Sequence, residues 1–134
     1  MIAKLALPRC PWKRAALILA ALSYVAVGVF HFVRPSFFLD IVPPFLPAPL
    51  ALVYISGVFE ILGGIGLLIP RTRRWASWGL IALLIAVYPA NIYMAMNPEI
   101  FVAKGFSEGS LYARLPFQFL FIAWAWWVGK PDPS

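Results

Sequence analysis

Apolar residues gather in four long runs along the chain, separated by short polar breaks. The runs cover residues 15–33, 50–69, 75–96 and 111–128, and each contains 18 to 22 residues. A helix of about 20 residues spans the ~30 Å hydrocarbon layer of a bilayer. The strict alternation of apolar and polar residues that is typical of a membrane β-barrel is absent from the sequence. The pattern therefore predicts an all-α, single-domain bundle of four transmembrane helices.

Composition supports a membrane protein. Of the 134 residues, 63% are hydrophobic and only 12% are charged, which is too little polar surface to coat a soluble domain. The connections between the runs are also too short to form a separate soluble domain. We therefore expect all 134 residues to belong to one integral membrane domain.

Basic residues concentrate at one end of the predicted bundle. Eight of the 11 lie before the first run, between the second and third, or after the fourth: Lys4, Arg9, Lys13, Arg14, Arg71, Arg73, Arg74 and Lys130. Arg34, Lys104 and Arg114 belong to the other end. The positive-inside rule then places both termini and the turn at 69–75 in the cytoplasm. This topology and anionic lipid at the inner face explain the net charge of +6 without a nucleic-acid partner.

A carboxylate lies near the middle of the second apolar run. Glu60 would be about 15 Å from either end of a helix over 50–69, close to the bilayer midplane. An ionisable side chain there costs at least ~2.5 kcal/mol by insertion scales, so it seldom faces lipid. Two interpretations stay open: Glu60 is a hydrogen-bonded structural carboxyl that holds helices together, or it handles a ligand or protons.

Small residues share the helix face of Glu60. Ser56, Glu60 and Gly64 recur every four residues, with Gly57 and Gly63 beside them. Small residues at this spacing allow helix backbones to approach closely in lipid. Glu60 is therefore predicted to face another helix.

Polar side chains from all four runs predict a pocket in the outer half of the bundle. Its members are His31, Glu60, Asn91, Arg114, Gln118, Tyr24 and Ser56. At about 1.5 Å per residue, Tyr24 lies near the level of Glu60 and Gln118 about 5 Å further out. By the same count His31 and Glu60 differ in depth by about 10 Å, too far for a direct bond unless the helices are offset. Water or a ligand would then have to connect them.

Two alternatives stay open for Arg114, which shares a helix face with Gln118. Its side chain either turns inward toward Glu60 or extends outward to the lipid headgroups. Pro89 and Pro116 each remove a backbone hydrogen bond in the outer half of a predicted helix, and such positions often accompany cavities. Together these residues predict a pocket that opens toward the outer side.

The two outer connections differ in composition. Residues 34–49 contain five prolines, and Pro35 is well placed to begin a short helix with an apolar face on the membrane surface. This segment is either an apolar linker at the interface or a cap over the outer end of the bundle. Residues 97–110 carry charges and glycines, and we expect an ordinary solvated connection.

The sequence lacks a self-contained catalytic or metal-binding set. With one histidine, the chain alone cannot supply two imidazole ligands to a haem, and with one cysteine it cannot form an internal disulfide. We therefore predict no catalytic residues, no metal site and no intrinsic cofactor.

Three segments carry a family resemblance: GVFHFVRPSFFLDIVPPFLP, YISGVFEILGGIGLLIPRTRRWASWGL and YPANIYMA. The matching positions are His31, Phe32, Pro35, Pro43, Pro44, Ser56, Gly57, Glu60, Gly63, Gly64, Gly66, Pro89, Ala90 and Asn91. Over the first three runs the chain resembles the DoxX-like family of small four-helix integral membrane proteins. The resemblance implies a four-helix bundle. Members of that family include small subunits of complexes that pass sulfur-derived electrons to quinone, and wider relatives act as assembly chaperones or cargo receptors.

Two functional hypotheses follow. In the first, the protein is an accessory subunit of a quinone-linked redox complex in the bacterial inner membrane. Glu60, with His31 or Asn91, would contact a quinone or bound lipid or relay protons, while a partner subunit holds the redox centre. In the second, it is an assembly factor whose face around Ser56, Glu60 and Asn91 pairs with a partner's helix. Other membrane or redox subunits, or further copies of the chain, are the expected partners.

Overall fold

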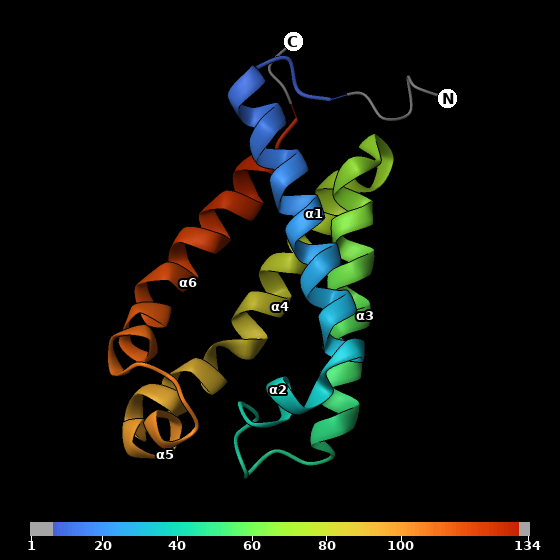
Figure 1. Cartoon of the computed structure of the whole chain (residues 1–134). Helices are drawn as coiled ribbons and strands as arrows, with labels where there is room; N and C mark the ends of the chain where they lie inside the picture. Colours follow the sequence, from blue (N-terminus) through green and yellow to red (C-terminus); the bar gives the residue numbers. More distant parts are fainter. Residues whose placement is uncertain (1–6, 132–134) are drawn as a thin grey trace.

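The computed structural model describes residues 7–131, and within this range the chain forms helices and no strand (Figure 1). The six helices are α1 (Pro11–Val33), α2 (Pro35–Leu39), α3 (Pro49–Leu68), α4 (Pro70–Met96), α5 (Pro98–Ala103) and α6 (Glu108–Gly129). The four long helices correspond to the four predicted runs. The prediction of an all-α fold is therefore confirmed for the described residues.

Proline sets the start of most helices. A proline stands in the first turn of α1, α2, α3, α4 and α5, where the missing N–H would have had no helical partner. The sequence prediction started the third long helix at residue 75, and this was wrong, because Pro70 begins α4 directly after Ile69. The arginines of the predicted turn are thus the first turn of α4. In α6 a side chain supplies the cap instead, since Ser107 Oγ accepts from the Ser110 N–H at 3.2 Å.

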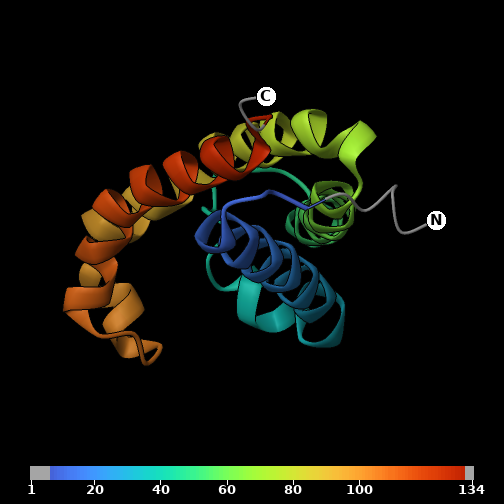
Figure 2. The same cartoon turned by 90° about the horizontal axis from the view of Figure 1, so that it is seen from above.

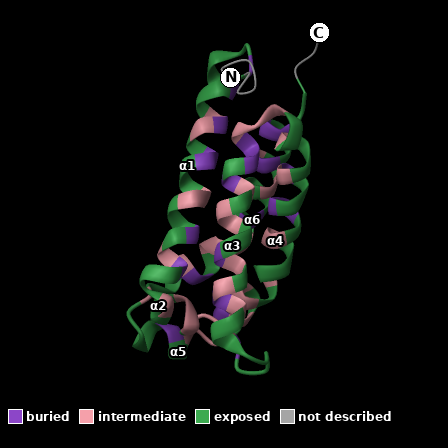
Figure 3. Cartoon of the chain, turned by 90° about the vertical axis from the view of Figure 1, so that its right-hand side faces the viewer, coloured by how far each residue is buried: buried purple, intermediate pink, exposed green. Residues whose placement is uncertain are grey.

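Three helices, α1, α3 and α4, are long and apolar enough to cross a membrane, so by length and composition the chain is a multi-pass membrane protein. Much of the surface of these helices is exposed (Figure 3). The exposed residues include the large apolar side chains of Leu19, Leu62 and Ile85. The fourth long helix, α6, contains the polar side chains of Arg114 and Gln118 and is not one of these three. A fourth membrane span stays a prediction.

The long helices are arranged as two pairs. Helix α1 packs mainly against α3, α4 packs mainly against α6, and α3 joins the pairs through α4. Seen from above, α6 runs along α4 (Figure 2), and at the end where the two described chain ends lie it also contacts α1, where Trp124 Nε1 donates to the Ala16 carbonyl. The pairs meet at the end that carries residues 7 and 131 and separate toward the end with α2 and α5 (Figure 1). The two ends of the described chain therefore lie together, and Lys4 falls outside the described residues.

The buried core has two parts, one at each end of the bundle. Where the two helix pairs meet, all four long helices contribute to a cluster made of Leu17, Ala20, Ala21, Leu67, Leu80 and Val128. At the opposite end, Met94, Phe101 and Leu111 form a second cluster. Phe101 belongs to α5 and is only 1% exposed. The expectation that 97–110 is an ordinary solvated connection was therefore wrong, because a short apolar helix packs there between α4 and α6.

Glycines allow α1 and α3 to approach closely. A Cβ atom on Gly64 would lie 2.7 Å from the carbonyl oxygen of Ala21, and one on Gly57 would lie 2.8 Å from the Cβ of His31. A Cβ on Gly28 of α1 would lie 2.7 Å from the carbonyl oxygen of Gly57. These backbones are therefore too close for any larger residue without movement. Of the small residues predicted around Glu60, Gly57 and Gly64 pack on α1, whereas Gly63 lies against Leu80 of α4.

Candidate functional site

The structure brings together His31 near the end of α1 and Glu60 in the middle of α3. The Nδ1 atom of His31 lies 3.3 Å from Oε2 of Glu60, and the two side chains are 8% and 17% exposed. The predicted separation of about 10 Å in depth was therefore wrong. Two of the seven candidate residues, one from α1 and one from α3, are therefore in direct contact.

The offset between the two helices explains this contact. Helix α3 begins beyond the level at which α1 ends, so the middle of α3 lies beside the last turns of α1 (Figure 1). The register follows from the glycine packing, in which Gly57 lies against the Cβ of His31 and the carbonyl oxygen of Gly28. Glu60 is one turn further along α3 and thus reaches the imidazole. The depth count had assumed that both helices start at a common level.

Hydrogen bonding fixes the proton on the imidazole. Nδ1 of His31 is 2.7 Å from the carbonyl oxygen of Val27, which can only accept a hydrogen bond, and it is also close to Glu60 Oε2. Nδ1 therefore carries hydrogen and donates it to Val27. Glu60 Oε2 is buried and accepts no hydrogen bond from the described chain. A carboxyl oxygen in an apolar interface is stabilised by a donor, so this oxygen can take a further hydrogen bond.

Helix α2 packs directly on the site. The ring of Phe38 is stacked on the imidazole of His31, with centroids 3.6 Å apart and the planes at 12°. Phe30 contacts both Phe37 and Phe38, which holds α2 against the end of α1. Of the two interpretations of residues 34–49, this contact favours the cap. The short helix after Pro35 is confirmed, although it ends at Leu39 before the two prolines at 43 and 44.

Gln118 and Arg114 do not join the His31–Glu60 pair. The side-chain amide of Gln118, 4% exposed, donates to the carbonyl oxygen of Leu84 and ties α6 to α4. The guanidinium of Arg114 lies over the ring of Phe106, 5.3 Å from its centroid, in the connection between α5 and α6. Its buried Nε has no acceptor in the described chain, and it makes no ion pair with Glu60. The inward alternative for Arg114 was therefore wrong.

Three candidates remain: Tyr24, Ser56 and Asn91. Tyr24 lies close enough to Glu60 to interact with it electrostatically, and it also packs against the core cluster where the helix pairs meet. Ser56 and Asn91 are partly buried. A pocket formed by all seven residues stays a prediction, because neither of the two pockets described below is lined by any of them.

The sequence did not predict the hydrogen bonds from side chains to backbone carbonyl groups at the basic end of the molecule. Lys13 Nζ donates to the carbonyl oxygen of Lys130 at 2.8 Å, and Trp124 Nε1 donates to that of Ala16 at 3.1 Å. In the same region Arg73 Nε donates to the Leu67 carbonyl at 2.6 Å. Lys13 and Arg73 therefore satisfy carbonyl groups that α6 and α3 leave without helical partners. The signal in the sequence for these hydrogen bonds was the position of the basic residues, which stand near the ends of the predicted helices.

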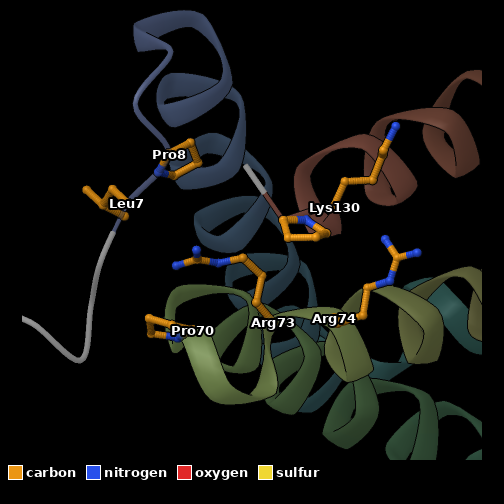
Figure 4. A pocket seen from close by; sticks show the side chains of 8 residues that line it. Leu7, Pro8, Pro70, Arg73, Arg74 and Lys130 are labelled. Atoms are coloured by element: carbon orange, nitrogen blue, oxygen red, sulfur yellow. The ribbon is translucent and has the colours of Figure 1, made fainter. Parts of the chain in front are cut away.

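Two pockets lie away from the pair. One, of 460 Å³, is at the basic end and is lined by Leu7, Pro8, Pro70, Arg73, Arg74, Gly129, Lys130 and Pro131 (Figure 4). The other is an open groove of 420 Å³ between α3 and α4. Its walls include Phe59, Gly63, Gly66, Thr72, Ala76 and Gly79.

These features define a small helical membrane protein with a capped histidine–glutamate pair between two of its helices. The chain belongs to the family described as Domain of unknown function (DUF8561), whose model matches residues 4–129. No curated protein and no solved structure matches the chain.

Proposed function

We propose that this protein is an accessory membrane subunit of a quinone-linked redox complex, in which the His31–Glu60 pair binds a quinone headgroup and exchanges protons with it. The observation that carries the proposal is the 3.3 Å contact between an imidazole and a carboxyl group in an otherwise apolar helix interface. Quinone reduction takes up protons, and an adjacent imidazole and carboxyl group can relay them. A partner subunit supplies the redox centre.

The surroundings of the pair support this proposal. The aromatic side chain of Phe38 covers one face of the imidazole, and exposed apolar side chains surround the helices. A quinone combines a flat, polar headgroup with an apolar tail, so it fits a site with a few polar atoms in apolar surroundings. The resemblance of the chain to the DoxX-like family, some of whose members serve quinone-linked complexes, points in the same direction.

The proposal includes a membrane arrangement. All four long helices span the bacterial inner membrane, and both termini are cytoplasmic. This is supported by α6, which runs alongside α4, and by the described chain ends, which lie together among the basic residues.

A second candidate function is a membrane assembly factor. The predicted partner face around Glu60 is covered by α1, so a client helix would need another surface. The groove between α3 and α4 provides one, because its walls are mostly apolar and three glycines, Gly63, Gly66 and Gly79, lie between the larger side chains.

Analysis of what co-purifies with the full-length protein tests these two candidates. We expect a mild-detergent extract to retain quinone at close to one molecule per chain, measured by chromatography and optical spectra. An unrelated membrane protein purified from the same membranes controls for carry-over of free quinone. A client protein without quinone would favour the assembly factor, and quinone at only the carry-over level would contradict the quinone proposal.

We expect both ends of the chain to be cytoplasmic, because basic residues cluster at the end where residues 7 and 131 lie. Reporter fusions after Ser134 and within 97–110 measure this directly. A cytoplasmic reporter should be active after Ser134 and a periplasmic one within the loop. Periplasmic activity after Ser134 would overturn the arrangement.

A further inference from the structure

We infer that the 460 Å³ pocket at the basic end binds the anionic, phosphate-bearing headgroup of a membrane lipid. Its walls come from the first turn of α4, from the end of α6 and from the residues before α1 (Figure 4). The pocket thus gathers three parts of the chain that are distant in sequence. Its size falls in the range of about 300–1,000 Å³ that is typical of sites for small ligands.

Two cations in the pocket wall keep hydrogen-bonding groups available. The guanidinium of Arg74 lies 5.3 Å from the ring centroid of Trp78, and Nζ of Lys130 lies 4.3 Å from that of Trp126. Stacking uses the face of a guanidinium, so its N–H edge remains able to donate to phosphate oxygens. The aromatic contacts restrict both side chains, which lowers the entropy lost when an anion binds.

The charge balance around the pocket favours an anion. Besides the pocket residues, this end of the described chain carries four further basic residues: Arg9, Lys13, Arg14 and Arg71. The described carboxylates lie elsewhere, with Glu60 in the middle of α3 and Asp40, Glu99 and Glu108 at the elements of the opposite end. Asp132 follows in the sequence, outside the described residues. Basic pockets at the cytoplasmic ends of membrane helices are the usual sites of anionic headgroups.

The tryptophans favour a lipid over a soluble phosphate. Trp78 and Trp126, which contact the two cations, and the neighbouring Trp75 are all exposed in the chain. Exposed tryptophans at the ends of membrane helices sit at the level of the headgroups. Arg74 and Lys130 are therefore held at the depth where lipid phosphates lie. This inference rests on the membrane arrangement and is independent of the role of His31 and Glu60.

Lipid retention by the full-length protein tests the site. Native mass spectrometry in a nonionic detergent would follow the binding of phosphatidylglycerol at about 0.15 M salt, where charges more than about 8 Å away are screened. We expect the wild type to retain one lipid, and Arg74→Gln and Lys130→Gln each to weaken its binding by about fivefold. Arg71→Gln is the matched control, because Arg71 is exposed in the same turn of α4 and does not line the pocket.

Each outcome decides the proposal. Loss of lipid in the two pocket variants, with retention in Arg71→Gln, supports it. Equal loss in all three would indicate diffuse surface charge and overturn it. If inorganic phosphate binds in an Arg74-dependent manner while the variants retain phosphatidylglycerol normally, the ligand is a soluble phosphate and the lipid assignment is wrong. Should Arg74→Gln unfold, Lys130→Gln is compared with Arg71→Gln instead, and the same loss of about fivefold is expected.

Discussion

We expect the Glu60→Gln protein to fold almost as well as the wild type and to bind quinone about tenfold more weakly. Glutamine keeps the shape of the side chain and can still pair with His31, but it cannot ionise. Hydrogen bonds to charged groups contribute about 1.5–3 kcal/mol and neutral ones about 0.5–1.5, and a difference of about 1.4 kcal/mol is tenfold in affinity. Quinone titration of the protein in lipid nanodiscs measures the effect, and thermal unfolding measures the fold.

Two further variants separate a functional carboxyl group from a structural one. If Glu60 only holds α1 and α3 together, glutamine should leave quinone binding unchanged and leucine should lower stability. If Glu60 exchanges protons, both Glu60→Gln and Glu60→Leu should lose function. Glu99→Gln removes an exposed carboxylate from α5 and serves as the control, with no expected change. Wild-type quinone affinity in Glu60→Gln would contradict the proton-exchange role.

The sequence located the long helices well, because each apolar run is a local signal that lipid selects. The helix starts were less predictable from hydropathy alone. Pro70 and the arginines that follow it are polar or helix-breaking by composition, yet Pro70 occupies the first turn of α4, where proline is tolerated. The burial of Phe101 could not be read from 97–110 either. It depends on Met94 and Leu111, which belong to the two neighbouring helices.

The sequence predicted which residues form the candidate site, but it did not predict how they are arranged in space. His31 and Glu60 stood out because ionisable side chains are expensive in apolar segments. Their contact depends on how far α1 and α3 are offset, and the close approach of Gly57 to His31 sets that offset. Such a register is a property of two packed helices, and counting residues along each helix separately cannot supply it. The stacking of Phe38 on His31 likewise requires α2 to fold back on α1.

Close glycine packing leads to the second large effect, a loss of stability in Gly64→Ala. The added Cβ would lie 2.7 Å from the Ala21 carbonyl oxygen and 2.8 Å from Cγ2 of Val25, so α1 and α3 must separate. Overpacking of this kind costs about 1–3 kcal/mol, which outweighs the gain of up to ~1 kcal/mol from replacing glycine by alanine in a helix. We expect a lower resistance to unfolding by SDS in mixed micelles.

Gly79→Ala in α4 is the matched control, because its Cβ would meet nothing within 4 Å. The same substitution should there be neutral or stabilise the protein by up to ~1 kcal/mol through helix propensity. Equal stability of the two variants would show that α1 and α3 do not pack as described. Gly57→Ala links packing to function, since its Cβ would lie 2.8 Å from that of His31. It should weaken quinone binding as well as stability, because displacing His31 breaks its contact with Glu60.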